Sequence, residues 1–114
     1  MISALFVASE ITYAEINIDK GIWIDVRTLE EFNSGNVKGA INIPHGEIGY
    51  RIKEATTDKN AEIHVYCRSG RRSGWAKDTL EGLGYTNVTN QGGYKDITKK
   101  LIAQSECKKV DGSC

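Results

Sequence analysis

Residues 64–74 read HVYCRSGRRSG, and this run joins a short apolar strand, a basic loop and the start of a helix. The strand ends on Cys67, and Arg68, Arg71 and Arg72 follow within five positions. In a turn from a strand into a helix, successive backbone N–H groups point toward one place, and the helix N-terminus adds positive potential there. The sequence therefore predicts a thiolate at Cys67, with a pKa well below the free-thiol value of about 8.5.

The same loop is suited to binding a small anion such as thiosulfate, phosphate or arsenate next to the nucleophile. Arg71 is the best candidate for direct contact with such a substrate, whereas the other two arginines could equally be solvated loop residues. Gly70 is expected to supply a backbone conformation that other residues resist, and the commoner role for Ser73 is to cap the following helix. The predicted substrate-binding residues are Arg68, Ser69, Gly70, Arg71, Arg72 and Ser73.

The composition is that of one ordinary globular domain. The chain has 114 residues, of which 39% are hydrophobic and 26% charged, and its formal net charge is zero. A neutral chain with no apolar run of membrane-spanning length gives no electrostatic or hydropathic case for a nucleic-acid or membrane partner. Its three cysteines, Cys67, Cys107 and Cys114, lack the spacing of a zinc site, so we expect no metal and no cofactor.

Apolar and polar segments alternate in a way that predicts strands alternating with helices. Strands are expected at 22–26, 40–43, 62–66 and 87–89, and helices at 28–33, 47–55, from Ser73 to Leu83, and from Tyr94 to Ile102. Thr28 and Glu31 form a capping-box pattern, and Gly92-Gly93 predicts a tight turn. This alternation favours an α/β fold with a parallel sheet covered on both faces and the Cys67 loop at the carboxyl edge of the sheet.

An ordered series of short blocks resembles the single-domain rhodanese family, and within it the small periplasmic rhodaneses of the phage shock protein E type. The blocks are IDVR at 24–27, EF at 31–32, GAINIP at 39–44, YCRSGRRS at 66–73, LGY at 83–85 and GG at 92–93. The resemblance covers about residues 21–102. One departure is Asn36, where the family often has His, and we expect it to affect packing more than chemistry.

The resemblance implies a three-layer α/β fold with a central parallel sheet of about five strands. It also implies a thiosulfate sulfurtransferase in which Cys67 is the catalytic residue and carries sulfane sulfur as a persulfide from thiosulfate to cyanide or a thiol. Asp25 would be a structural carboxylate that fixes the loop or pairs with an arginine. Arg27 would pair with a carboxylate, for which Glu31 is the candidate.

The resemblance implies a rhodanese domain at 21–103, and the two ends of the chain lie outside it. Residues 1–20 form an N-terminal segment, of which 1–9 could be either the remnant of a secretory leader or a strand or frayed end. Residues 104–114 form a polar tail that we expect to be disordered, and the sequence does not decide whether Cys107 and Cys114 form a disulfide. We expect a periplasmic monomer, or a cytoplasmic one if Met1 is the true start.

Two other functions are compatible with these residues. One is a persulfide carrier or binding module without catalysis, against which the intact cysteine and its cationic loop argue. The other is a cysteine-dependent phosphatase or arsenate reductase, whose loop places an arginine six positions after the cysteine. Position 73 is Ser73 and the nearest arginine is Arg72, so the shorter loop favours a sulfur atom over a phosphoryl group.

Overall fold

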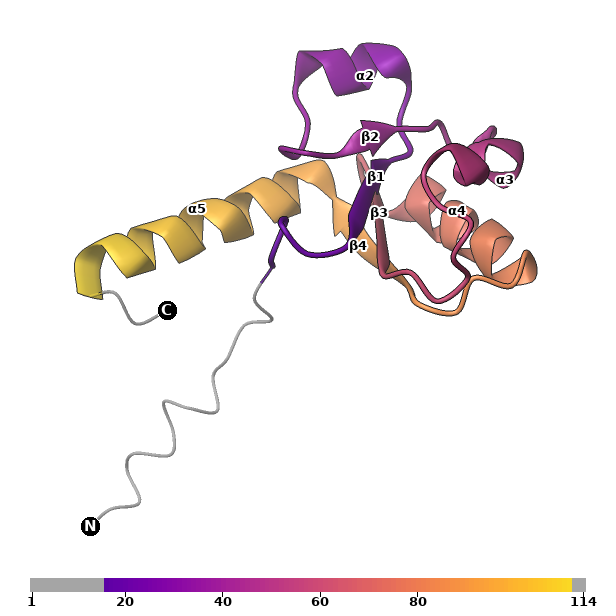
Figure 1. Cartoon of the computed structure of the whole chain (residues 1–114). Coiled ribbons are helices and arrows are strands. Elements are labelled where there is room, and N and C mark those ends of the chain that lie inside the picture. Colours follow the sequence, from indigo (N-terminus) through magenta and orange to yellow (C-terminus); the bar gives the residue numbers. More distant parts are fainter. Residues whose placement is uncertain (1–15, 112–114) are drawn as a thin grey trace.

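A short parallel sheet forms the centre of the computed structural model, which describes residues 16–111 with side chains through residue 106 (Figure 1). Its strands are β1 (Ile22–Asp25), β2 (Ile41–Asn42), β3 (Ile63–Cys67) and β4 (Val88–Gly93). They lie in the order β2-β1-β3-β4, and every pairing is parallel. The described residues therefore contain four strands, where the family resemblance implied about five.

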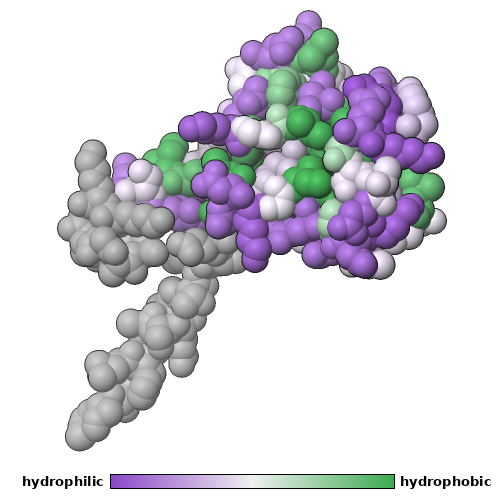
Figure 2. Space-filling view, viewed as in Figure 1, coloured by the Kyte–Doolittle hydropathy of each residue, from purple (hydrophilic) through white to green (hydrophobic). Residues whose placement is uncertain are grey.

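Helices connect the strands, as the alternating pattern predicted. They are α2 (Leu29–Ser34), α3 (Ile48–Arg51), the 3₁₀ turn η1 (Ile52–Glu54), α4 (Arg71–Gly82) and α5 (Tyr94–Asp111). None of the helices in this part of the chain is long and apolar enough to cross a membrane. Apolar side chains reach the surface in small groups among hydrophilic ones on the face drawn in Figure 2.

Each face of the sheet has its own apolar cluster because side chains alternate along a strand. Ile24 and Val65 point to the face covered by α3, η1 and α4, where they pack with Ile48, Ile52, Ala76 and Leu80. The intervening Trp23 and Tyr66 point to the other face and pack with Ile16, Val37 and Ile97. The prediction of a sheet covered on both faces is confirmed.

Local signals placed α2 correctly. The Thr28 side chain accepts from the Glu31 backbone N–H at 3.1 Å, and the Glu31 carboxylate accepts from the Thr28 N–H at 3.1 Å, which completes the predicted capping box. Gly35 ends the helix with a φ of 156°. Both signals involve residues close in sequence, which is why the sequence alone located them.

Two predicted boundaries near the Cys67 loop were wrong. Helix α4 begins at Arg71, two residues before the predicted start, and its N-cap is Gly70 in the left-handed region at φ 98°. Ser73 is therefore inside the first turn and does not cap the helix. Gly92 and Gly93 do not form the predicted tight turn, because both belong to β4. The pairing of β4 with β3 shifts its register between Val65 and Cys67.

The two ends of the domain are joined to each other. Helix α5 continues to Asp111, so the segment predicted as a polar tail is helical over most of its length. The Gln104 side chain accepts from the Ile16 N–H at 2.8 Å and donates to the Ile16 carbonyl at 3.1 Å. Residues 1–9 and the side chains of Cys107 and Cys114 lie outside the described residues.

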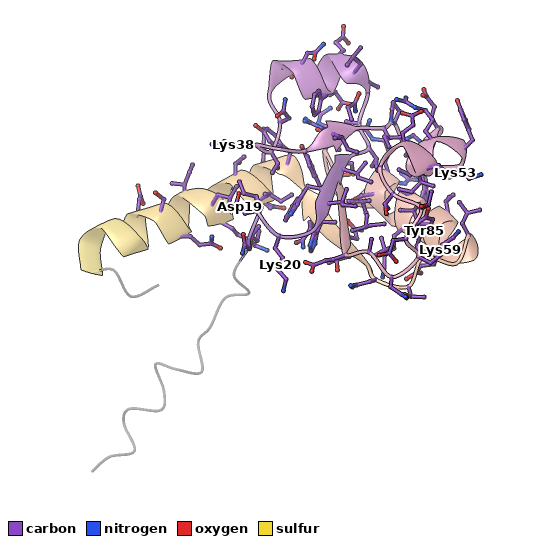
Figure 3. All side chains as sticks on the ribbon, viewed as in Figure 1. Asp19, Lys20, Lys38, Lys53, Lys59 and Tyr85 are labelled. Atoms are coloured by element: carbon purple, nitrogen blue, oxygen red, sulfur yellow. The ribbon has the colours of Figure 1, made fainter. Side chains whose placement is uncertain are left out.

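The edge of the sheet opposite the Cys67 loop is closed by a contact between Lys59 and Tyr85, the two residues labelled there in Figure 3. Lys59 Nζ lies 4.4 Å from the centre of the Tyr85 ring and donates to the Leu83 carbonyl at 2.7 Å. Leu83, at which the helix was predicted to end, is 43% exposed, and α4 ends one residue earlier at Gly82. This edge is structural, and the chemistry-bearing side chains are at the other one.

Candidate active site

The carboxyl ends of three strands meet at one edge of the sheet and position the Cys67 loop, which we define as residues 67–73. Strand β3 ends at Cys67, while β1 ends at Asp25 and β4 at Gly93 on either side of it. In parallel sheets this is the edge at which ligands bind. Ser69 and the arginines Arg68 and Arg71 are exposed there, Gly70 and Arg72 are half-buried, and Ser73 is buried.

The Cys67 sulfur lies inside a set of hydrogen-bond donors. The residue is fully buried, and its Sγ accepts from the Gly70 N–H at 2.9 Å and from the Ser73 N–H and hydroxyl at 3.4 Å each. Burial, the largest single influence, raises the pKa of the thiol, but the hydrogen bonds from Ser73, Ser69 and Gly70 together lower it below its ordinary value. The predicted direction of the pKa is confirmed.

Asn90 is a loop-supporting residue that the sequence reasoning missed. Its Oδ1 accepts from the Gly92 N–H at 2.9 Å and from the Ser73 hydroxyl at 2.7 Å, and its Nδ2 donates to the Gly70 carbonyl at 3.0 Å. The Ser73 hydroxyl has a single proton and can donate it to only one acceptor at a time. It donates to Asn90 Oδ1 when the sulfur is a neutral thiol, and a negative charge on the sulfur favours donation to Sγ instead. No local pattern marks Asn90, because its partners lie 2, 17 and 20 residues away.

We expect Ser73→Ala to move the pH midpoint of Cys67 alkylation upward, because the thiolate loses one hydrogen-bond donor while the burial that opposes ionisation remains. The measurement is the rate of iodoacetamide labelling as a function of pH. Ser69→Ala is the matched control, because Ser69 acts on the sulfur through its backbone N–H only. An unchanged midpoint in Ser73→Ala would show that the hydroxyl does not stabilise the thiolate.

Gly93 allows β4 to pass close behind the loop. A Cβ at this position would lie 2.6 Å from the Arg68 carbonyl oxygen and 3.4 Å from the Ser69 Cα, both of which are backbone atoms. We expect Gly93→Ala to displace the start of the loop, lowering sulfur-transfer activity by at least about tenfold and the melting temperature by several degrees.

Gly82→Ala is the control for this substitution, since nothing lies within 4 Å of its added Cβ and alanine is the better helix former. We expect this variant to keep its activity and to be as stable as the wild type or more so. Equal activity in the Gly93→Ala and Gly82→Ala variants would contradict the close approach of β4 to the loop.

The three loop arginines have different surroundings. The Arg72 guanidinium forms a two-pronged ion pair with Glu31 of α2, at 2.7 and 3.0 Å. Arg71 lies over the ring of Trp75, with its guanidinium carbon 5.2 Å from the ring centre. Among the described residues, Arg68 and Arg71 have no ion-pair partner, so their charges remain available to an anion at the mouth of the loop.

The Glu31–Arg72 pair makes stability depend on pH. The pKa of Glu31 is lowered from 4.5 to about 2, and the largest cause is the hydrogen bond that its carboxylate accepts from Arg72. Because the pKa of Glu31 is lower in the folded than in the unfolded chain, the ion pair stabilises the fold fully when the pH is above about 4.5. This stabilisation is lost as the pH falls from about 4.5 to about 2. We therefore expect Glu31→Gln to flatten the fall in melting temperature over this pH range, and an equally steep fall in the variant would contradict the assignment.

Asp25 and Arg27 form a buried ion pair behind the loop. Asp25 Oδ1 accepts from the Arg27 backbone N–H and Nε at 2.9 Å each, and Oδ2 accepts from Nη2 at 2.6 Å. The guanidinium also donates to the Gly35 carbonyl at 2.6 Å and lies 4.6 Å from the Tyr94 ring centre. The prediction that Arg27 pairs with a carboxylate was right, but Glu31 was the wrong partner, because Arg72 binds it.

Within the part of the chain that the structure describes, no three His, Cys, Asp or Glu side chains gather closely enough to hold a metal ion. His64 lies below the site, stacked on Trp23 at 4.7 Å, with Glu62 2.7 Å from its Nε2 and Gln91 2.9 Å from its Nδ1. Both of its ring nitrogens have polar partners, so it is a structural residue. The arrangement at the loop is suited to thiolate chemistry on a small anion.

Comparisons with known proteins agree with this chemistry. The family model described as a rhodanese-like domain matches residues 10–100. The thiosulfate sulfurtransferase PspE of Escherichia coli is 53% identical over 80 residues, which are 70% of this chain and 77% of PspE. The chloroplastic thiosulfate sulfurtransferase 16 of Arabidopsis thaliana is 36% identical over 88 residues, covering 68% of this chain and 73% of the relative. A solved rhodanese with anions from E. coli is 52% identical with a TM-score of 0.64, covering 66% of this chain and 88% of that one.

Proposed function

Because the chain belongs to the rhodanese-like family, whose model matches residues 10–100, we propose that it is a thiosulfate sulfurtransferase that works through a persulfide on Cys67. The observation that supports this most directly is the ring of N–H and hydroxyl donors around the Cys67 sulfur. Such donors stabilise negative charge on sulfur both before and after it accepts a second sulfur atom.

In the first half-reaction, the Cys67 thiolate attacks the outer sulfur of thiosulfate. A new S–S bond forms to Cys67, the S–S bond of thiosulfate breaks, and sulfite leaves with the electron pair of the broken bond. Thiosulfate is a dianion, so its binding requires cations at the mouth of the loop. Arg71 and Arg68 are our proposed contacts, whereas Arg72 acts through its ion pair with Glu31.

In the second half-reaction, a thiolate or cyanide attacks the outer sulfur of the persulfide. The bond between the two persulfide sulfurs breaks, and the Cys67 thiolate leaves with its electron pair. The donors from Gly70 and Ser73 stabilise this leaving group, so the thiolate that begins the cycle is restored.

The test is the intact mass of the protein after incubation with thiosulfate and then with cyanide. We expect a gain of one sulfur atom, located on Cys67, that cyanide removes as thiocyanate forms. A reduced and alkylatable Cys67 that gains no sulfur would overturn the proposal. Trapping of a persulfide from other donors, with negligible thiosulfate turnover, would favour a sulfur carrier.

Phosphoryl or arsenate chemistry is the less suitable alternative. Such loops place an arginine six positions after the cysteine, and that position is Ser73, whose hydroxyl and N–H face the sulfur. Arg72, one position earlier, is paired with Glu31. Turnover of aryl phosphates that depends on Cys67 would favour this alternative.

A monomeric state and a periplasmic location remain predictions from the family resemblance. The apolar segment 1–9 lies outside the described residues. Sedimentation of the purified protein tests the first prediction, and fractionation of the producing cell tests the second.

A further inference from the structure

A cavity of about 260 Å³ lies beside the Cys67 loop, and of its lining residues the mechanism above uses Arg68 as a substrate contact. It is bounded by Arg27, which follows β1, by the loop residue Arg68, by two residues of α2 and by the first two residues of α5. The lining residues are Arg27, Glu31, Ser34, Arg68, Tyr94 and Lys95. Three segments distant in sequence, around residues 27–34, 68 and 94–95, therefore converge on one hollow at the same edge of the sheet as the nucleophile.

The charges of this lining favour an anion. The carboxylate of Glu31 is already neutralised by Arg72, and the Arg27 cation is neutralised by Asp25 behind it. Arg68 and Lys95 are both exposed and have no ion-pair partner among the described residues. Two uncompensated cations therefore remain at a cavity whose only carboxylate is already paired.

The cavity is connected to the catalytic loop through two residues. Arg68 directly follows Cys67, so its side chain is shared between the loop and the cavity. Glu31 is held in the wall by Arg72, which is also a loop residue. A molecule anchored in the cavity by a negative group therefore lies next to Arg68, the residue that directly follows Cys67.

Resting on the proposed function, we propose that this cavity binds the carboxylate of a small acceptor thiol, with Lys95 and Arg68 as its cationic contacts. The thiolate end of the acceptor attacks the outer sulfur of the Cys67 persulfide. One S–S bond forms on the acceptor, the S–S bond of the persulfide breaks, and Cys67 leaves as a thiolate. The transfer has no net oxidation or reduction and needs no further reactant.

The test compares two acceptors of nearly equal size, one with an anionic and one with a neutral end group, 3-mercaptopropionate and 3-mercaptopropanamide. The full chain is loaded with thiosulfate, excess thiosulfate is removed, and loss of the persulfide is followed by intact mass at about 0.15 M salt. The readout is the second-order rate constant for discharge by the acid divided by that for discharge by the amide, so that changes in the reactivity of the persulfide cancel.

We expect Lys95→Glu to lower this ratio about fivefold or more, because the charge reversal replaces an attraction with a repulsion. Lys99→Glu is the matched control, since it makes the same charge change at an exposed position one turn further along α5, outside the lining. This control should leave the ratio unchanged.

Four outcomes overturn the proposal. An unchanged ratio in Lys95→Glu would show that the cavity does not distinguish the anionic acceptor from the neutral one. A fall in Lys99→Glu as large as that in Lys95→Glu would show the same. If loading by thiosulfate slows as much as discharge to the acid, the cavity serves the donor. If the wild type forms no persulfide at all, the proposed function itself is contradicted, and the acceptor site, which rests on it, is contradicted as well.

Discussion

Cys67→Ser is expected to abolish sulfur transfer, lowering the production of thiocyanate by at least about 10³-fold while the fold stays intact. The serine hydroxyl occupies the same buried position and can accept the same hydrogen bonds from Gly70 and Ser73, so packing changes little. It cannot form a persulfide, and a hydroxyl is far from ionised near neutral pH. The measurements are thiocyanate production and the mass gain with thiosulfate.

A circular dichroism melt of the same variant is the control, and its midpoint should stay close to that of the wild type. Retention of substantial activity by a folded Cys67→Ser variant would remove Cys67 from the mechanism. If the Cys67→Ser variant loses both activity and fold, Cys67→Ala provides a second variant without the thiol, in which no polar group remains inside the ring of donors. Activity is then measured in whichever variant is folded.

Asp25→Ala is expected to have the largest effect on stability, lowering the free energy of unfolding by about 3–5 kcal/mol. The Asp25 side chain is fully buried, and the Arg27 side chain is 6% exposed. Removing the carboxylate leaves a guanidinium buried between aromatic rings with the Gly35 carbonyl as its remaining acceptor. Urea unfolding followed by fluorescence measures the change.

The double variant Asp25→Leu/Arg27→Met separates the ion pair from the packing. Because both charges are removed together, we expect it to recover most of the stability that the single variant loses. If the double variant is no more stable than Asp25→Ala, the loss comes from packing, and the account of a buried unpaired charge is wrong.

The sequence predicted those features whose causes lie close together along the chain. The capping box of Thr28 and Glu31 and the buried face of Ile48 and Ile52 depend on spacings of three and four residues, which a single sequence displays. The strand that ends at Cys67 was recognised for the same reason. These elements already place the thiol at the edge of the sheet.

The errors concern partners that only the folded chain brings together. Ser73 has the chemistry of a helix cap, but the helix begins earlier because Gly70 takes a left-handed conformation, and the serine then points at the sulfur and Asn90. Glu31 is near Arg27 in sequence yet binds Arg72, which is 41 residues away. Such choices depend on how α2 lies against the loop, which no spacing along the sequence encodes.

Complete burial of Cys67 separates the two halves of the reaction by accessibility. The free thiol is completely shielded from solvent, so we expect a donor to reach it only when the loop moves. Once loaded, the outer sulfur lies about 2 Å beyond Sγ, the length of an S–S bond. Burial also keeps the sulfurs of two molecules too far apart for a disulfide to link them. The empty enzyme is thereby protected from oxidative coupling, and loading is expected to respond to viscosity more strongly than discharge.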